Sequence, residues 1–259
     1  MSGSKNKMSD PKAIIIGISG CSSSGKTTLA RLLRDIFPST FVLHEDDFYK
    51  SDAEIPEKDG LADWDCPEAI NIPDLERALE HIRAEGTFPP FVQSKEDQNS
   101  IGPSPITPVE IDSAKSLVSS ASLPSSLRIC ILDGFLLYSP PSFSRVMSLL
   151  DIKLFLLADK TKATQRREAR DGYVTLEGFW KDPPGYVEKI VWPNYVESHK
   201  WLFTDGDVER GVLDQEVLKR EGIEAPVAKA YEEVKFGEVL KWAVEVVLKK
   251  LEEVNKGGN

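Results

Sequence analysis

The stretch AIIIGISGCSSSGKTT, at residues 13–28, decides the fold of this chain. Its apolar first part predicts a buried β-strand, and the strand is followed by a Gly-x-x-x-x-Gly-Lys-Thr pattern at 20–27. In such a loop the glycines let backbone N–H groups surround phosphate oxygens, and the lysine reaches the β and γ phosphates. The segment TLARLLRDIF at 28–37 predicts an amphipathic helix with its positive dipole end at the anion. The pattern therefore indicates a site for a nucleoside triphosphate.

The loop residues are the first candidate ligand contacts. Lys26 is the candidate cation for the transferred phosphate, and the Thr27 hydroxyl is a candidate ligand of Mg²⁺. A plain Ser/Gly turn between a strand and a helix is the alternative interpretation. The candidate ATP-binding residues in this loop are Gly20, Cys21, Ser22, Ser23, Ser24, Gly25, Lys26 and Thr27.

Composition bounds the class of protein. The 259 residues are 41% hydrophobic and 29% charged, as in an ordinary globular protein of one large or two small domains. A net charge of −10 argues against nucleic acid or an anionic membrane as a partner. Three cysteines without metal-ligand spacing suit a reducing compartment, and no apolar run approaches a membrane span. With no signal-like start, we expect a cytoplasmic protein.

Strands alternate with helices along the chain, which predicts an α/β fold with a mainly parallel central sheet flanked by helices. We expect residues 1–11 to be disordered and 12–259 to form one domain. The stretch 87–126, with six prolines and many serines, is expected to be an insertion with a short helix at 109–120. The expected strands are 13–18, 40–44, 127–132 and 152–157, and the expected helices are 26–37, 74–86, 141–149, 160–171, 186–201 and 227–254.

Carboxylates follow two of the predicted strands. Asp46 and Asp47 come directly after strand 40–44, and Asp133 ends the apolar run LRICIL. In a parallel sheet these ends meet at one edge, where phosphoryl transfer needs a base and ligands for Mg²⁺. We favour Asp46 as the base that takes the proton of an acceptor alcohol, and Asp133 as a Mg²⁺ ligand. The alternatives are that Asp47 caps a turn beginning at Phe48 and that Asp133 is an N-cap.

Three arginines share a short predicted helix. Arg166 and Arg170 are four positions apart and lie on one face, while Arg167 points about 100° away. One helix could thus offer cations both to ATP and to the acceptor. A solvated basic face is an equally good interpretation of the spacing alone.

The pair Trp64-Asp65 combines an aromatic plate with a carboxylate. Asp65 could bind two neighbouring ribose hydroxyls while Trp64 stacks on a flat base. The competing interpretation, slightly favoured by the pattern, is that Asp65 caps a helix opened by Pro67 and Glu68. The three histidines form no constellation, and we assign them no role.

These segments together resemble the nicotinamide riboside kinases, members of the uridine kinase-like P-loop kinases. The resemblance spans most of residues 13–200. The phosphate loop and the DDFY-like motif are shared with uridine kinases, and the later segments are more particular to the riboside kinases. The segments that carry it are GISGCSSSGKTTLA at 17–30, EDDFYK at 45–50, DWDCPEAI at 63–70, ILDGFLLY at 131–138, QRREAR at 165–170 and DPPGYVEKIVWPNYV at 182–196.

The resemblance implies a small helical lid at about 160–185 and transfer of the γ-phosphoryl of ATP to the 5′-hydroxyl of nicotinamide riboside. On matched positions, Asp46 is the proton acceptor and is associated with Mg²⁺. Asp65 holds the ribose diol beside Trp64. The resemblance further implies ATP contacts at Thr28, Arg166 and Arg170, and acceptor contacts at Asp47, Phe48, Tyr49, Arg167 and Tyr173, the last as the second face of an aromatic sandwich.

A physical argument favours the same acceptor. Nicotinamide riboside carries a pyridinium cation, which prefers an aromatic face and nearby carboxylates to a basic pocket. A pyrimidine nucleoside kinase for uridine or cytidine is the alternative, although a uracil edge would need hydrogen-bonding groups where Trp64 stands. A non-catalytic nucleotide-binding regulator is a second alternative, which the retained base and metal ligands disfavour. We expect small-molecule partners and a monomer or weak homodimer.

Overall fold

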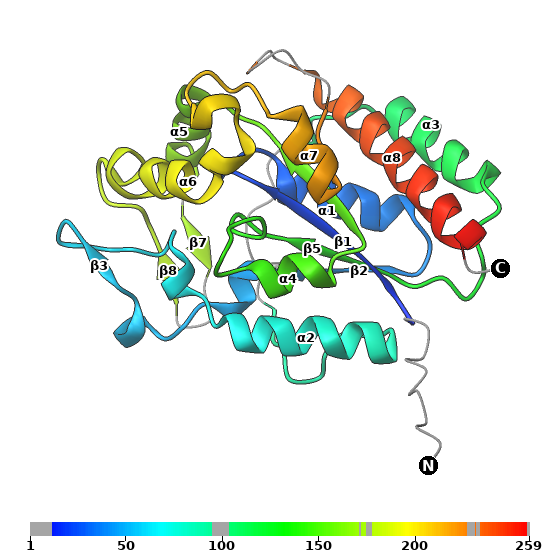
Figure 1. Cartoon of the computed structure of the whole chain (residues 1–259), viewed down its shortest axis with the longest axis horizontal. Coiled ribbons are helices and arrows are strands. Elements are labelled where there is room, and N and C mark those ends of the chain that lie inside the picture. Colours follow the sequence, from blue (N-terminus) through cyan, green and yellow to red (C-terminus); the bar gives the residue numbers. More distant parts are fainter. Residues whose placement is uncertain are drawn as a thin grey trace.

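The computed structural model describes residues 12–94, 104–170, 172–174, 178–226, 231 and 234–257. Its centre is a sheet of five parallel strands in the order β2-β5-β1-β6-β9 (Figure 1). This topology confirms the predicted α/β fold with a mainly parallel sheet. The strands are β1 (Ile14–Gly20), β2 (Thr40–His44), β5 (Ile129–Asp133), β6 (Ile152–Leu156) and β9 (Ile223–Glu224).

Helices cover both faces of the sheet, and β1 shows why. All seven residues of β1 are buried, and alternate side chains enter two different cores. Ile16 packs with helices α1, α3 and α8, whereas Ile15 packs with α2, α4 and α6. The helices on the first face are α1 (Lys26–Ile36), α3 (Pro108–Ser120) and α8 (Phe236–Gly257), and those on the second are α2 (Ile72–Glu85), α4 (Ser144–Leu149), α6 (Trp192–His199) and α7 (Gln215–Glu221).

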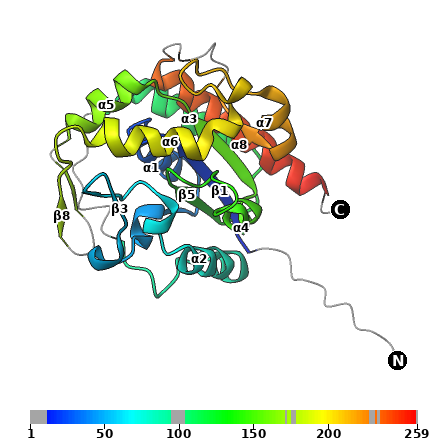
Figure 2. The ribbon, with the colours of Figure 1, turned by 60° about the vertical axis from the view of Figure 1, so that its left-hand side comes forward.

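Local signals set the helix ends. Helix α2 begins where the Asn71 side chain accepts from the backbone of Asp74, and it ends at Gly86 with φ of 69°. Helix α3 is the short helix expected in the insertion, and Thr107 and Glu110 form a capping box at its start. Helix α8 lies beside α3 in Figures 1 and 2, and it begins at Phe236, later than the sequence predicted. Residues 1–11 and 95–103 of the predicted tail and insertion lie outside the described residues.

The predicted helical lid is helical only in part. Helix α5 (Lys160–Glu168) is followed by an antiparallel hairpin of β7 (Tyr173–Val174) and β8 (Phe179–Trp180). A second hairpin, β3 (Glu57–Lys58) with β4 (Leu61–Ala62), lies at the same end of the molecule (Figures 1 and 2). The helix predicted for 186–201 is present as one helical segment, in which a π-helical turn precedes α6. The short turns are η1 (Glu45–Phe48), η2 (Asp52–Glu54), η3 (Pro67–Ala69), η5 (Val187–Val191), η6 (Lys200–Leu202) and η7 (Thr204–Gly206).

No helix in the described part of the chain is both long and apolar enough to cross a bilayer.

Candidate active site

The phosphate loop joins β1 to α1, and its backbone requires glycine at both ends. Gly20 has φ of 144° and Gly25 has φ of 102°, which is backbone geometry that side chains other than hydrogen rarely tolerate. A Cβ on Gly20 would overlap the carbonyl oxygen of Leu156 on the neighbouring strand. A Cβ on Gly25 would lie 2.7 Å from Cε2 of Phe236, the first residue of α8. The loop is thus enclosed by β6 and α8.

Lys26 and Thr27 at the end of the loop lie near Asp133, the last residue of β5. Lys26 is the first residue of α1, is 8% exposed, and donates from Nζ to the carbonyl of Cys21 at 3.0 Å. The Thr27 hydroxyl hydrogen-bonds the Asp133 carboxylate. Cys21 itself is buried, and this burial raises the pKa of its thiol to about 11, so the thiol stays protonated. Lys26, Thr27 and Asp133 therefore meet at one point, as the pattern predicted.

Asp133 is placed as an ionised carboxylate. It is the last residue of β5 and lies in register with His44 of β2, whose Nδ1 is 3.3 Å from Asp133 Oδ2. Burial raises the pKa of Asp133, but bonds from His44 and Thr27 and the Lys26 charge outweigh it and lower that pKa. No helix begins at Asp133, so the N-cap interpretation is wrong. A carboxylate beside a threonine hydroxyl is a donor set that suits Mg²⁺.

The turn η1 carries three consecutive acidic residues, Glu45, Asp46 and Asp47, whose side chains differ in exposure. Asp46 is exposed at the sheet edge, and Asp47 is partly buried. The turn begins at Glu45, so Asp47 does not cap a turn starting at Phe48, and that alternative is wrong. Phe48 is 5% exposed and packs into the core, where it anchors the turn that carries Asp46.

Glu45 belongs to the same site, although the sequence offered no signal for it. It is fully buried, and Oε2 accepts from the backbone N–H of Leu136 at 3.1 Å. Burial, together with Asp46 and Asp133, raises the pKa of Glu45 to about 8. A Cβ on Gly134 would overlap this carboxylate, which explains the glycine directly after Asp133. Glu45 thus fixes the chain that follows β5.

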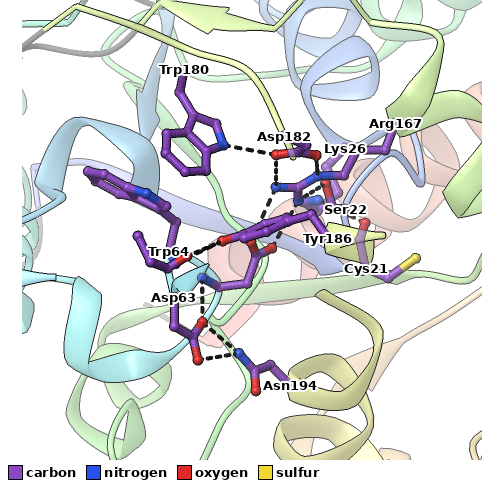
Figure 3. Close-up of polar contacts among 12 residues, drawn as sticks. Cys21, Ser22, Lys26, Asp63, Trp64, Arg167, Trp180, Asp182, Tyr186 and Asn194 are labelled. Carbon is purple, nitrogen blue, oxygen red and sulfur yellow. Dashed lines mark hydrogen bonds and ion pairs between the residues drawn. The ribbon is translucent and has the colours of Figure 1, made fainter. Parts of the chain in front are cut away.

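Arg167 connects several residues of the predicted acceptor site (Figure 3). Its guanidinium makes two bonds to Asp65, at 2.9 and 3.2 Å, and two to Asp182, at 2.6 and 3.2 Å. The same group donates to Ser22 Oγ of the phosphate loop at 2.9 Å. Arg167 is 8% exposed, so a solvated basic face is the wrong interpretation for this residue. Asp182 is a residue that sequence reasoning missed.

Asp65 does not cap a helix. It is 4% exposed, and the nearby turn η3 begins after Cys66 without any side-chain cap, so the cap interpretation is wrong. Burial raises the pKa of Asp65, and the charge and hydrogen bonds of Arg167 oppose that effect. Bidentate pairing with Arg167 orients both carboxylate oxygens in one plane.

The other two arginines lie on different parts of the chain: Arg166 is on α5, whereas Arg170 follows that helix, which ends at Glu168 and not at 171 as predicted. Arg166 donates from Nη1 to the carbonyl of Ser23 at 3.4 Å, which puts it beside the phosphate loop. Arg170 is exposed, and its contact with ATP stays a prediction. Helix α5 therefore offers cations in two directions, with Arg166 toward the loop and Arg167 toward Asp65.

Three aromatic rings lie together above the acceptor side. The ring centroids of Trp64 and Tyr49 are 5.3 Å apart, edge to face, and those of Trp64 and Trp180 are 5.6 Å apart. Trp180 ends β8 and donates from Nε1 to Asp182 at 2.9 Å (Figure 3). The sequence pointed to Tyr173 instead, because nothing in DGYVTLEGFWK marks which aromatic faces Trp64. The Tyr173 side chain lies outside the described part, so its role stays a prediction.

Comparison with known proteins gives a consistent result. No family model matches the chain. A nicotinamide riboside kinase of Schizosaccharomyces pombe is 43% identical over 206 residues, which are 80% of this chain and 87% of that protein. A nicotinamide riboside kinase of Saccharomyces cerevisiae is 34% identical over 254 residues, 93% of this chain and 98% of that protein. Nicotinamide riboside kinase 2 of Homo sapiens is 30% identical over 215 residues, 80% of each chain.

Proposed function

The chain belongs to the nicotinamide riboside kinases, and on that premise we propose that it phosphorylates nicotinamide riboside with ATP. The γ-phosphoryl group would pass to the 5′-hydroxyl of the riboside and give nicotinamide mononucleotide, a step of NAD synthesis. The single observation that carries this proposal is Arg167, which contacts the phosphate loop at Ser22 and the diol candidate Asp65 at once. One side chain thus joins a donor half and an acceptor half.

The residues divide the chemistry between them. Asp46 would accept the proton of the 5′-hydroxyl as that oxygen forms its bond to the γ-phosphorus. The bond from that phosphorus to the bridging oxygen breaks at the same time, and ADP leaves with the electron pair. Lys26 and Arg166 would balance the charge on the phosphate oxygens. Asp65 would accept from two ribose hydroxyls, which requires Arg167 to release part of its bidentate contact and keep Asp182.

Thr27, Asp133 and Asp46 would hold Mg²⁺. The fit rests on the Thr27 hydroxyl and the ionised Asp133 carboxylate, which already contact each other at the end of β5. When bound, Mg²⁺ neutralises phosphate charge and orients the γ-phosphate. Asp133 is kept ionised by His44, so its ligand form is present at neutral pH.

The acceptor side supports a flat cationic base. Trp64 offers an aromatic face, and Trp180 and the Asp182 carboxylate lie near it (Figure 3). The Asp65 carboxylate joins the same cluster through Arg167. Aromatic faces and carboxylates attract a pyridinium cation more than a neutral uracil. We infer that Trp180 has to move away from Trp64 for a ring to enter, because 5.6 Å is too short to hold a third ring between two others.

A panel of ribosides tests the proposal. ADP release is measured with nicotinamide riboside, nicotinic acid riboside, uridine and cytidine as acceptors, and with ATP or GTP as donor. We expect kcat/KM for nicotinamide riboside to exceed that for uridine at least about tenfold, which is 1.4 kcal/mol of transition-state binding. A preference for uridine or cytidine would make the chain a pyrimidine nucleoside kinase. Nucleotide binding without turnover of any riboside would favour a regulator.

We also propose a cytoplasmic monomer or weak homodimer without nucleic-acid or membrane partners. The net charge of −10 supports the part of this proposal that concerns nucleic acid and anionic membranes. Light scattering over a range of concentrations tests the oligomeric state.

A further inference from the structure

The acceptor residues Trp64 and Asp65 lie on a loop, not on a strand or helix. Strand β4 ends at Ala62 and the turn η3 begins at Pro67, so the residues between them need other support. A binding loop contributes to affinity only when its backbone is held in place before the ligand arrives. The backbone of 62–65 therefore has to be held by contacts with other parts of the chain.

The Tyr186 hydroxyl makes the first connection. It accepts from the backbone N–H of Trp64 at 3.0 Å and donates to the carbonyl of Ala62 at 3.0 Å. Tyr186 is 1% exposed, and its ring lies 5.5 Å from the Arg167 guanidinium carbon. The hydroxyl thus bridges two backbone groups on either side of Asp63.

Asn194 makes the second connection through Asp63. Its Nδ2 lies 2.7 and 2.9 Å from the two carboxylate oxygens of Asp63, and Asp63 Oδ1 accepts from the backbone N–H of Asp65 at 3.1 Å. Lys58 Nζ donates to Asn194 Oδ1 at 2.6 Å and fixes the orientation of the amide. Asp63 and Asn194 are 4% and 9% exposed, so water competes little for these bonds. Figure 3 shows Asn194 beneath Asp63 and Tyr186 beside Trp64.

The π turn explains how one helical segment supplies both contacts. Tyr186 and Asn194 are eight positions apart and flank η5 (Val187–Val191). Eight residues of a regular α-helix would place them roughly 80° apart around the axis, whereas seven would place them on nearly one face. A π turn accommodates one additional residue. With the π turn, Asn194 therefore lies on nearly the same face of the helical segment as Tyr186, as a residue seven positions away would in a regular α-helix.

We propose that Tyr186 and Asn194, aligned by the π turn, are positioning residues for the phosphoryl acceptor. They hold the backbone of 62–65 so that the Trp64 ring and the Asp65 carboxylate are already placed for the riboside. The inference rests on the proposed function, because it assigns this loop to the acceptor. The hydrogen bonds of Tyr186 and Asn194 join them to the segment 58–64 and not to the phosphate loop, so we expect their loss to affect the riboside KM and not the ATP KM.

Tyr186→Phe is the first test, with Tyr195→Phe as its matched control. Among the described residues the buried Tyr195 hydroxyl has no hydrogen-bond partner, although Tyr195 lies on the same helical segment. We expect Tyr186→Phe to raise the riboside KM about five- to tenfold and to leave the ATP KM within about twofold. Tyr195→Phe should leave both KM values within about twofold. Equal riboside KM values for the two variants would overturn the role of Tyr186.

An exchange of partners is the second test. Asn194→Asp places two carboxylates together, and we expect the riboside KM to rise at least about tenfold. Adding Asp63→Asn restores one amide and one carboxylate, and the riboside KM should return to within about threefold of the original value. Failure of the double variant to recover, while its melting temperature equals that of the unchanged protein, would overturn the positioning role. A parallel rise of the ATP KM would do the same.

These outcomes are separate from the fate of the proposed function. If the unchanged protein prefers another riboside in the panel, the same KM comparison is made with that riboside. The acceptor assignment then fails while the two positioning residues are still tested. If nicotinamide riboside is the substrate and both variants behave as the unchanged protein, the inference fails alone.

Discussion

The donor half and the acceptor half of the site are built in opposite ways. The phosphate loop is one contiguous segment, Gly20–Thr27, and two glycine dihedral angles set its shape. The acceptor half gathers side chains from the segment at 58–65, from α5, and from the helical segment 186–194, and hydrogen bonds between side chains hold it together. Backbone geometry thus defines one half, and a network of buried polar groups defines the other.

The two halves are therefore vulnerable to different substitutions. A contiguous loop of this kind is most vulnerable at its own glycines, where a Cβ is not tolerated. A network of buried polar groups can fail at any member, because each group left without its partner costs free energy. The following experiments test that contrast, beginning with the largest effect.

Asp46 lies at the boundary between the halves and should show the largest effect. We expect Asp46→Asn to lower kcat about 10²- to 10⁴-fold, because the acceptor hydroxyl loses its base. The melting temperature should change little, since the side chain is exposed. Single-turnover kinetics would check this, with Asp35→Asn on α1 as an exposed control. Unchanged turnover would remove Asp46 from the role of base.

Gly25→Ala should break the donor half alone. The side chain would be forced to φ of 102° and would press on Phe236 at 2.7 Å. These two costs together are about 3 kcal/mol, so kcat/KM for ATP should fall about 10²-fold while the riboside KM is nearly unchanged. Adding Phe236→Ala should recover only part of the loss, because the dihedral strain stays. Full recovery would show that crowding, not backbone geometry, sets the loop.

Arg167→Ala should break the acceptor half. It leaves the buried carboxylate of Asp65 and the partly buried carboxylate of Asp182 without their cation, and we expect riboside kcat/KM to fall at least about tenfold, or 1.4 kcal/mol. Arg145→Ala, at an exposed ion pair with Glu80, serves as the control. A change of less than twofold would mean that Arg167 serves the phosphate loop through Ser22 more than the acceptor.

The last effect is on folding stability and not on catalysis, and it concerns pH and the support of α6. Burial lowers the pKa of His199 to about 4, below its usual 6.5, while its ring packs between Phe155 and Tyr195. Between these two values the unfolded chain binds more protons, so the stability due to neutral His199 is lost as pH falls from about 6.5 to 4. The loss approaches about 3 kcal/mol. Urea unfolding at several pH values should show a flatter dependence for His199→Phe.

Sequence patterns predicted the parts of the fold and the site that are determined by residues adjacent in the chain. The strand, loop and helix around Lys26 follow from local periodicity and glycine spacing, and the structure places them as expected. Asp133 could be predicted because strand ends in a parallel sheet share one edge. In each case the residues that come together are neighbours in the chain or lie at the ends of adjacent strands.

The remaining acceptor residues could not be predicted in this way. Asp182 and Trp180 matter only because the β7-β8 hairpin folds back onto Arg167, and hairpin register has no signal in this segment. Tyr186 and Asn194 do not share a face at α-helical spacing, so periodicity separates them until the π turn is seen. Glu45 points inward only because the turn η1 rotates it away from Asp46.

Phe236 determines when, during synthesis of the chain, the donor half can be completed. The ring that closes over Gly25 opens the last helix of the described chain, so it leaves the ribosome after the whole sheet has been made. During synthesis the emerging chain would therefore carry a phosphate loop without the Phe236 ring packed against Gly25. We therefore expect stalled nascent chains ending before α8 to bind ATP weakly, with nucleotide affinity gained only when synthesis is nearly complete.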